Sequence, residues 1–189
     1  MSGAPALAAE GAVFRFRVFV PATAAMMAVV AAANVLVQHP FTPFGLGETL
    51  TWGAFAYPFS FLVTDLANRL GGPGTARRVV YAGFALGVVL SVFLATPRIA
   101  AASGAAFLAG QLLDITVFTR LRRAAWWKAP LFASALGSVV DTALFFGLAF
   151  AGTEVPWTRL ALGDLAVKFA YAVLLLAPFR MAVARLRPA

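Results

Sequence analysis

The sequence lacks cysteine and has one histidine, His39. Without thiols, disulfide frameworks and thiolate zinc sites are excluded, and a single histidine leaves no basis for Cys–His catalysis. Charge is also scarce, since 12% of the 189 residues are charged, against about 25% in a soluble globular domain. Hydrophobic residues make up 62% of the chain and its mean hydropathy is +0.88. This composition is typical of a polytopic membrane protein.

Acidic residues are fewer than basic ones, with 7 Asp and Glu against 15 Lys and Arg, a formal charge of +8. In a soluble protein this excess would suggest nucleic-acid binding, which requires a basic face or stripe. Here the bases stand in small groups between apolar runs. Lipid headgroups are therefore the expected partners, and no nucleic-acid partner is predicted.

Six apolar runs are long enough to cross a bilayer, for which a helix needs roughly 20 residues. They lie at about 18–37, 50–70, 79–96, 99–121, 129–152 and 160–182. The sequence predicts an all-α membrane protein with one six-helix domain over 18–182. A short N-terminal tail, 1–17, precedes it, and a basic C-terminal tail, 183–189, follows it.

The distribution of Lys and Arg predicts the orientation. Twelve of them fall in or beside alternate segments that include both tails, and two, Arg98 and Arg159, fall on the opposite side. The positive-inside rule then places both termini in the cytoplasm. Trp126, Trp127 and Trp157 are expected at the membrane interfaces.

Three aspartates fall within predicted spans. Acidic side chains in a membrane are costly, about 2.5–3.5 kcal/mol near its centre, and usually face a cavity or a partner. Other polar and aromatic residues share their helical faces or line up on neighbouring spans. The candidate substrate-binding residues are Asn34, Phe61, Asp65, Asn68, Gln111, Asp114, Asp141 and Lys168. We expect the three aspartates to converge on one partly hydrated hollow.

Some features allow two interpretations. Lys168 either forms a structural i,i+4 pair with Asp164, or reaches the cavity near Tyr171 and faces an aspartate. Pro58 either merely kinks its helix or breaks it as transporters do at substrate sites. Serine and threonine on the polar stripes are also typical of helix packing in lipid.

Catalysis is not expected. His39 lies in a predicted outer loop without a nearby nucleophile, and the Gly-x-Gly-Asp signature of intramembrane aspartyl proteases is absent before Asp141. No cofactor and no metal site are expected. No nucleotide-binding loop of the Gly-x-x-x-x-Gly-Lys type occurs, so any ATP drive would come from another subunit.

Three segments carry a family resemblance: "YPFSFLVTDLANRLGG" (57–72), "GAAFLAGQLLDITVFTRLR" (104–122) and "SALGSVVDTALFFGLAF" (134–150). With them the chain resembles the queuosine precursor transporter family, also called the VUT family, six-helix proteins of the bacterial inner membrane. The resemblance implies import of 7-deazaguanine bases, such as the cyano and aminomethyl forms, for tRNA queuosine modification. It also implies a bundle similar to the substrate-binding subunits of vitamin transporters. Many members have Asn-Glu where this chain has Asn68-Arg69.

The candidate residues suit such a ligand. A carboxylate accepts both the ring N–H and the exocyclic amine of a guanine-like base, an amide reads its carbonyl edge, and an aromatic ring stacks on it. The sequence leaves open a proton-coupled carrier, a facilitator, or a substrate-binding subunit of a multi-component transporter. A non-transporting membrane scaffold is the alternative from another class, and a homodimer is also left open.

Overall fold

The computed structural model describes residues 4–186, and the side chains of residues 16–186. Within that range the chain is helical, apart from its loops and one isolated antiparallel bridge between Pro40 and Thr51. In order, the elements are α1 (Ala4–Leu36), η1 (Pro43–Glu48), α2 (Gly53–Ala56), α3 (Phe59–Gly71), α4 (Pro73–Leu94), α5 (Pro97–Leu121), α6 (Lys128–Phe150), α7 (Trp157–Leu174) and α8 (Leu176–Leu186). The predicted all-α architecture is confirmed.

Five helical segments of the described chain are long and apolar enough to cross a membrane. They are Phe16–Leu36, Pro73–Leu94, Pro97–Leu121, Lys128–Phe150 and Trp157–Leu186, the last made of α7 and α8 together. The exception among the six predicted spans is 50–70, which the structure divides into the short α2 and the 13-residue α3. The predicted count of six is therefore not established by helix length.

The division between α2 and α3 follows from Pro58. Proline has no N–H to give to the preceding turn, so the ladder is interrupted there. The next amides bond three residues back instead, from Ser60 N to the Tyr57 carbonyl at 2.9 Å and from Phe61 N to the Pro58 carbonyl at 3.2 Å. Tyr57 and Pro58 keep right-handed helical dihedrals, so the chain continues in the same winding sense. The sequence prediction of a bend or break at Pro58 is confirmed.

The helix ends differ most from expectation at the two termini. Helix α1 begins at Ala4, so the described part of the expected N-terminal tail is helical. Helix α8 ends at Leu186, which makes residues 183–186 of the expected C-terminal tail helical as well. Residues 1–3 and 187–189 of the two predicted tails lie outside the described residues. Between α7 and α8, Pro178 removes the amide that would bond the Leu174 carbonyl, and α7 ends at that residue.

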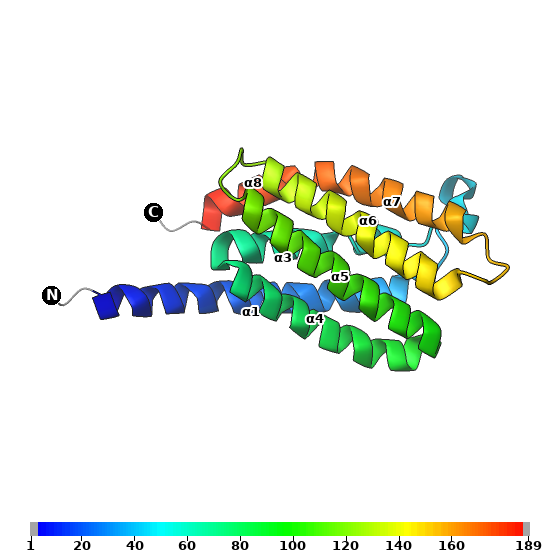
Figure 1. Cartoon of the computed structure of the whole chain (residues 1–189), viewed down its shortest axis with the longest axis horizontal. Coiled ribbons are helices and arrows are strands. Elements are labelled where there is room, and N and C mark those ends of the chain that lie inside the picture. The colour runs from blue at the N-terminus through cyan, green and yellow to red at the C-terminus, as the bar shows by residue number, and fades with distance from the viewer. Residues whose placement is uncertain (1–3, 187–189) are drawn as a thin grey trace.

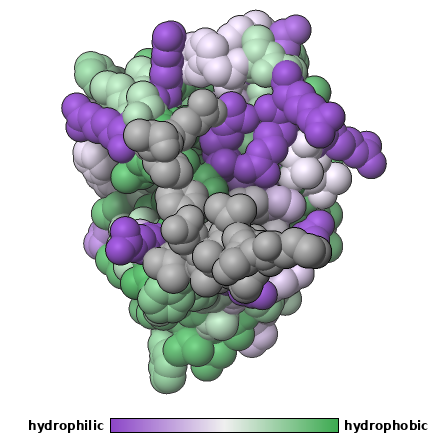
Figure 2. Space-filling view, turned by 90° about the vertical axis from the view of Figure 1, so that its left-hand side faces the viewer, coloured by the Kyte–Doolittle hydropathy of each residue, from purple (hydrophilic) through white to green (hydrophobic). Residues whose placement is uncertain are grey.

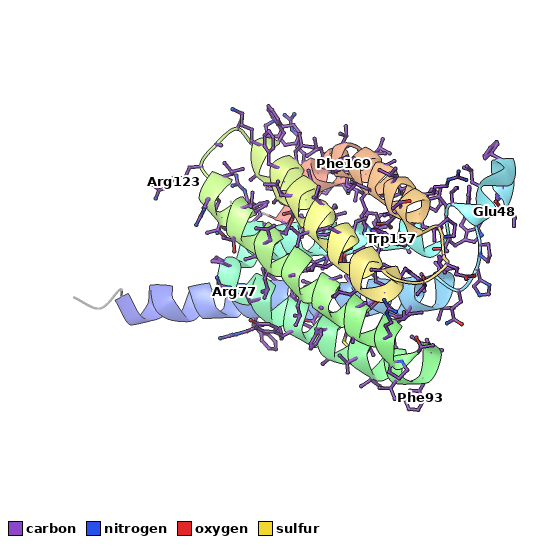
Figure 3. All side chains as sticks on the ribbon, turned by 45° about the vertical axis from the view of Figure 1, so that its right-hand side comes forward. Glu48, Arg77, Phe93, Arg123, Trp157 and Phe169 are labelled. Atoms are coloured by element: carbon purple, nitrogen blue, oxygen red, sulfur yellow. The ribbon has the colours of Figure 1, made fainter. Side chains whose placement is uncertain are left out.

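Both ends of the described chain lie at the same end of the bundle, where the first turns of α1 project beyond the other helices (Figure 1). We call this the terminal end. Viewed from there, hydrophilic side chains gather on the surface (Figure 2). Arg77 and Arg123 lie at the terminal end, whereas Glu48 and Trp157 lie at the opposite end (Figure 3). The loops rich in lysine and arginine and the loops with few of these residues thus lie at opposite ends of the long axis.

The tightest crossing joins α5 and α6, which pack more extensively than any other pair of helices. A methyl group on Gly110 would lie 2.9 Å from Asp141 Cβ and 3.0 Å from the Gly137 carbonyl oxygen. A methyl group on Gly137 would lie 2.9 Å from the Gly110 carbonyl oxygen and 3.3 Å from Asp114 Cβ. Small residues let helix backbones approach closely in membranes. The crossing therefore fixes Asp114 on one side of it and Asp141 on the other.

Arginine side chains satisfy carbonyls at several helix ends. Arg122 Nη2 donates to the Asn68 and Arg69 carbonyls at 2.8 and 2.6 Å, and Arg69 Nη1 donates to the Arg122 carbonyl at 2.9 Å. At the opposite end, Arg98 donates to the Leu148 carbonyl at 2.9 Å and the Ala151 carbonyl at 2.5 Å. Because the last carbonyls of a helix have no partner within it, these contacts cap α3, α5 and α6.

Candidate functional site

A cavity of about 450 Å³ lies at the end of the bundle opposite the termini. The ends of α1, α4 and α6 and the beginnings of α2, α5 and α7 surround it, and we call it the main cavity. Gln38, Leu94 and Thr96 on its rim are exposed, whereas Asp141 and Lys168 in its floor are buried. The cavity is thus open at one end and polar at depth.

A charged cluster forms the floor of the main cavity. Lys168 Nζ lies 2.6 Å from Asp141 Oδ2 and 2.6 Å from Asp164 Oδ2, and it donates to Thr142 Oγ1 at 3.0 Å. Thr142 Oγ1 donates in turn to Asp164 Oδ2 at 2.7 Å. Both interpretations of Lys168 are therefore correct in part, because it pairs with Asp164 and also faces Asp141.

Tyr57 completes this floor cluster. Its hydroxyl donates to Asp141 Oδ1 at 2.6 Å, and Lys168 Nζ lies 4.9 Å from the centre of its ring. Tyr57 occupies the interruption between α2 and α3, so its position depends on Pro58. Sequence reasoning did not select it as a site residue, although a tyrosine directly before a helix-breaking proline was the available signal.

Gln111 is held by protein partners from α3. Thr64 Oγ1 donates to Gln111 Oε1 at 2.5 Å, and Gln111 Nε2 donates to Ser60 Oγ at 2.8 Å. All three side chains are fully buried. This Gln111 triad links α3 to α5 below the floor of the main cavity, on the side toward the terminal end.

Asp65 and Asp114 form a second buried group, which we call the acid pair. Their carboxyl groups lie within interaction range of each other, and Asp65 Oδ2 accepts a hydrogen bond from Ser134 at 3.1 Å. Asp65 Oδ1 and both carboxyl oxygens of Asp114 have no hydrogen-bond partner among the described residues. Such unsatisfied buried acceptors are rare in proteins.

The remaining candidates lie at different depths. Asn68 Nδ2 donates to the Ile115 carbonyl and to Thr119 Oγ1, both at 3.2 Å, while its Oδ1 has no partner among the described residues. Asn34 lines the main cavity and donates to the Val30 carbonyl at 2.9 Å. Phe61 is buried, with its ring edge-on to Tyr57 at a centroid distance of 6.1 Å.

The predicted site residues therefore occupy two levels rather than one hollow. Asn34, Asp141 and Lys168 line the main cavity, whereas Phe61 and Asp65 line a small cavity of about 10 Å³. Lys168 lines both. Asn68, Gln111 and Asp114 line neither of these two cavities. The Gly110–Gly137 crossing separates the levels, since Asp141 and Asp114 flank it on opposite sides.

These features define a class of protein. Membrane-spanning helices that enclose a cavity open at one end, with charged groups buried at its floor, are the architecture of a small-molecule transporter. Residues 51–95 and 89–183 match the family described as "Putative vitamin uptake transporter". The chain belongs to this family.

Several curated proteins are similar over most of their length. A queuosine precursor transporter of Escherichia coli (strain K12) is 36% identical over 178 residues, 79% of each chain. A probable queuosine precursor transporter of Haemophilus influenzae is 33% identical over 79% of each chain, and one of Bacillus subtilis (strain 168) is 28% identical over 82% of this chain and 80% of its own. No solved structure matches the chain. The resemblance drawn from the three sequence segments is confirmed.

Proposed function

We propose that this chain imports queuosine precursors, 7-deazaguanine bases, across the bacterial inner membrane. The relative that is 36% identical is named a queuosine precursor transporter, and the one that is 33% identical is named a probable queuosine precursor transporter. The observation that carries the proposal for this chain is the main cavity, whose floor presents Asp141 and Lys168. Its volume of about 450 Å³ lies within the range of about 300–1,000 Å³ typical of small-molecule sites.

The proposed topology has six crossings with both termini in the cytoplasm. Residues 53–71, which comprise α2, the interruption and α3, form the sixth crossing. At 1.5 Å per residue these 19 residues reach about 28 Å, close to the thickness of the hydrocarbon core. The excess of lysine and arginine at the terminal end supports this orientation. The main cavity then opens to the outer side of the membrane.

The ligand would bind by its donor-rich edge. The Asp141 carboxylate accepts the ring N–H and exocyclic amine of a guanine-like base, displacing the Tyr57 hydroxyl from Oδ1. The bound base then competes for Asp141 with Lys168, which also pairs with Asp164. Phe145 and Phe146 line the same cavity and supply aromatic faces. Asn34, higher in the wall, supplies an amide.

Below this floor the path toward the terminal end is closed. The Gln111 triad joins α3 to α5, and the reciprocal Arg69–Arg122 contacts join the same two helices at their ends. Import would require α3 to separate from α5, which breaks both sets of hydrogen bonds. The interruption at Pro58 gives α3 a point about which to move relative to α2.

The experiment uses a bacterium that cannot make queuosine precursors and has this gene as its only importer. At low external precursor, we expect queuosine in its tRNA with the wild-type protein and none with Asp141→Asn. Glu48→Gln is the matched control, because it makes the same acid-to-amide change at an exposed position outside the cavity. Membrane levels are measured for each variant. Absence of queuosine with well-inserted wild-type protein would reject the substrate assignment.

A second assay separates the carrier from a subunit that needs an ATPase. The purified chain is placed alone in lipid vesicles, and exchange of labelled 7-cyano-7-deazaguanine for unlabelled base is measured. A carrier exchanges the base without other proteins. If exchange appears only after a copurifying ATPase is added, the chain is a substrate-binding subunit.

A further inference from the structure

We propose that Asp65 and Asp114 form the proton-binding site that couples import to the inward proton gradient. The inference rests on the proposed function, and it assigns a ligand to the buried group that the main cavity does not use. The acid pair lies between the Gln111 triad and the Arg69–Arg122 contacts, within the closed half of the path.

The geometry of the pair calls for a missing hydrogen-bond donor. Three carboxyl oxygens of the pair and Asn68 Oδ1 are buried acceptors without a partner among the described residues. The donor that reaches the pair is the Ser134 hydroxyl, on Asp65 Oδ2. Two ionised carboxylates side by side repel each other, and burial strengthens the repulsion. One proton shared between them removes one charge and supplies an O–H donor to the other carboxylate.

Among the described residues, no cationic side chain forms a salt bridge with Asp65 or Asp114 that would neutralise the pair. Lys168 forms ion pairs with Asp141 and Asp164. Lys168 lines the small cavity with Asp65, but its ammonium group is held by the two aspartates of the floor cluster. The pair is therefore not neutralised from the main cavity.

Titratable groups on the neighbouring helices have other partners or lie at the surface. Arg69 and Arg122 lie at the ends of α3 and α5, where each binds main-chain carbonyls. The buried residues of α1, α4 and α8 carry no titratable side chain within the described range. On α6, Ser134 donates to Asp65, and Asp141 lies beyond the Gly110–Gly137 crossing.

The space around the pair excludes larger ligands. The small cavity beside Asp65 has a volume of about 10 Å³, close to the space of a single water molecule. A 7-deazaguanine base does not fit there. Among the described residues, no group of three or more histidines and acids is placed to hold a metal ion. A proton needs no such space, because it bonds directly to a carboxyl oxygen of the pair.

The shared position of Lys168 links the two levels. When a base binds Asp141 by its donor edge, it competes with Lys168 for that carboxylate, and Lys168 lines the small cavity that reaches Asp65. An ammonium group turned toward Asp65 favours the ionised pair and so the release of its proton. In each cycle an O–H bond forms on one carboxyl of the pair with a proton from the outer side, and it breaks when that proton leaves to the cytoplasm.

The experiment compares two modes of transport by the full chain in lipid vesicles. Exchange of labelled for unlabelled 7-cyano-7-deazaguanine needs no net proton movement. Accumulation driven by an imposed pH gradient does, and one pH unit sustains about tenfold accumulation if one proton accompanies each base. A pH-sensitive dye inside the vesicles reports proton entry. The variants are Asp114→Asn and Asp65→Asn, with Glu48→Gln as the matched acid-to-amide control.

The expected result is that wild-type protein and Glu48→Gln accumulate the base and admit protons. Asp114→Asn and Asp65→Asn should keep exchange within about twofold, a change under 1 kcal/mol in barrier, and lose accumulation and proton entry. Gradient-driven accumulation by both variants at the wild-type level would overturn the proposal. So would wild-type accumulation that follows a sodium gradient, or exchange without any response to either gradient.

If both variants fail to insert, proton entry induced by the base in the wild-type protein decides whether transport is coupled to protons. Ser134→Ala, which is expected to shift the pH dependence of accumulation, then decides whether the acid pair is the site. Absence of wild-type exchange would instead refute the proposed function.

Discussion

The close crossing of α5 and α6 predicts that Gly137→Ala weakens the protein and displaces both acidic levels. The new methyl group would lie 2.8 Å from Phe61 Cε1 and 2.9 Å from the Gly110 carbonyl oxygen. The ring of Phe61 can turn, but the carbonyl belongs to the backbone of α5. The two helices must therefore move apart by several tenths of an ångström.

The magnitude follows from two opposing effects. Forcing a methyl group into a well-packed contact costs about 1–3 kcal/mol. Alanine also favours the helix over glycine by roughly 0.5–1 kcal/mol. Gly147→Ala on the same helix gains this propensity without a clash, because nothing lies within 4 Å of the methyl position. The difference between the two variants isolates the clash, and we expect Gly137→Ala to be the less stable by about 1–3 kcal/mol.

The assay is unfolding of the purified full-length variants in matched micelles, followed by loss of helical circular dichroism. Exchange of labelled base in vesicles is measured in parallel, since the separation of α5 and α6 should reduce it. Equal unfolding midpoints for Gly137→Ala and Gly147→Ala would refute the reasoning. They would show that α5 and α6 do not approach as closely as described.

Three further changes test the site. Lys168→Met leaves the two acids of the floor cluster without their cation and should lower the free energy of unfolding by about 3–5 kcal/mol. Adding Asp164→Asn should restore part of this loss, which thermal unfolding measures. Gln111→Ala leaves two buried hydroxyls without a partner and should cost about 1–3 kcal/mol; because Gln111 does not line the main cavity, the affinity for the base in a binding titration should stay near wild type. Pro58→Ala restores an amide at the interruption and should preserve insertion while slowing exchange, and wild-type exchange rates in this variant would contradict a hinge at that position.

Much of the fold follows from the sequence because lipid imposes a simple rule on helix length and polarity. Four of the six apolar runs each correspond to a single helix, as α5 (97–121 against the expected 99–121) shows, whereas 50–70 and 160–182 are each divided between two helices. The interruption at Pro58 was predictable because proline lacks the amide N–H that would continue the helix. The early start of α1 at Ala4 was not anticipated, since the N-terminal segment contains polar residues that mark it as a tail outside the membrane, yet its alanines favour a helix.

The site was only partly predictable because the sequence shows which face a residue occupies but not which helices meet there. The burial of the acids at positions 65, 114 and 141 was expected from their faces. Their division into two levels depends on the Gly110–Gly137 contact, which no single helix reveals. The contact of Lys168 with Asp141, 27 residues away, likewise depends on the relative rotation of α6 and α7.

Arg98 has a consequence for reading membrane orientation from charge. Topology rules weigh each cation as if it were free to meet the lipid surface, but Arg98 directs its guanidinium at the final carbonyls of α6. Its charge is partly offset by the negative pole of that helix. Arg69 and Arg122 meet helix-terminal carbonyls at the other end in the same way, so a count of Lys and Arg overstates the charge that each end presents to the lipid surface, and replacing Arg98 to alter orientation would also remove the cap of α6.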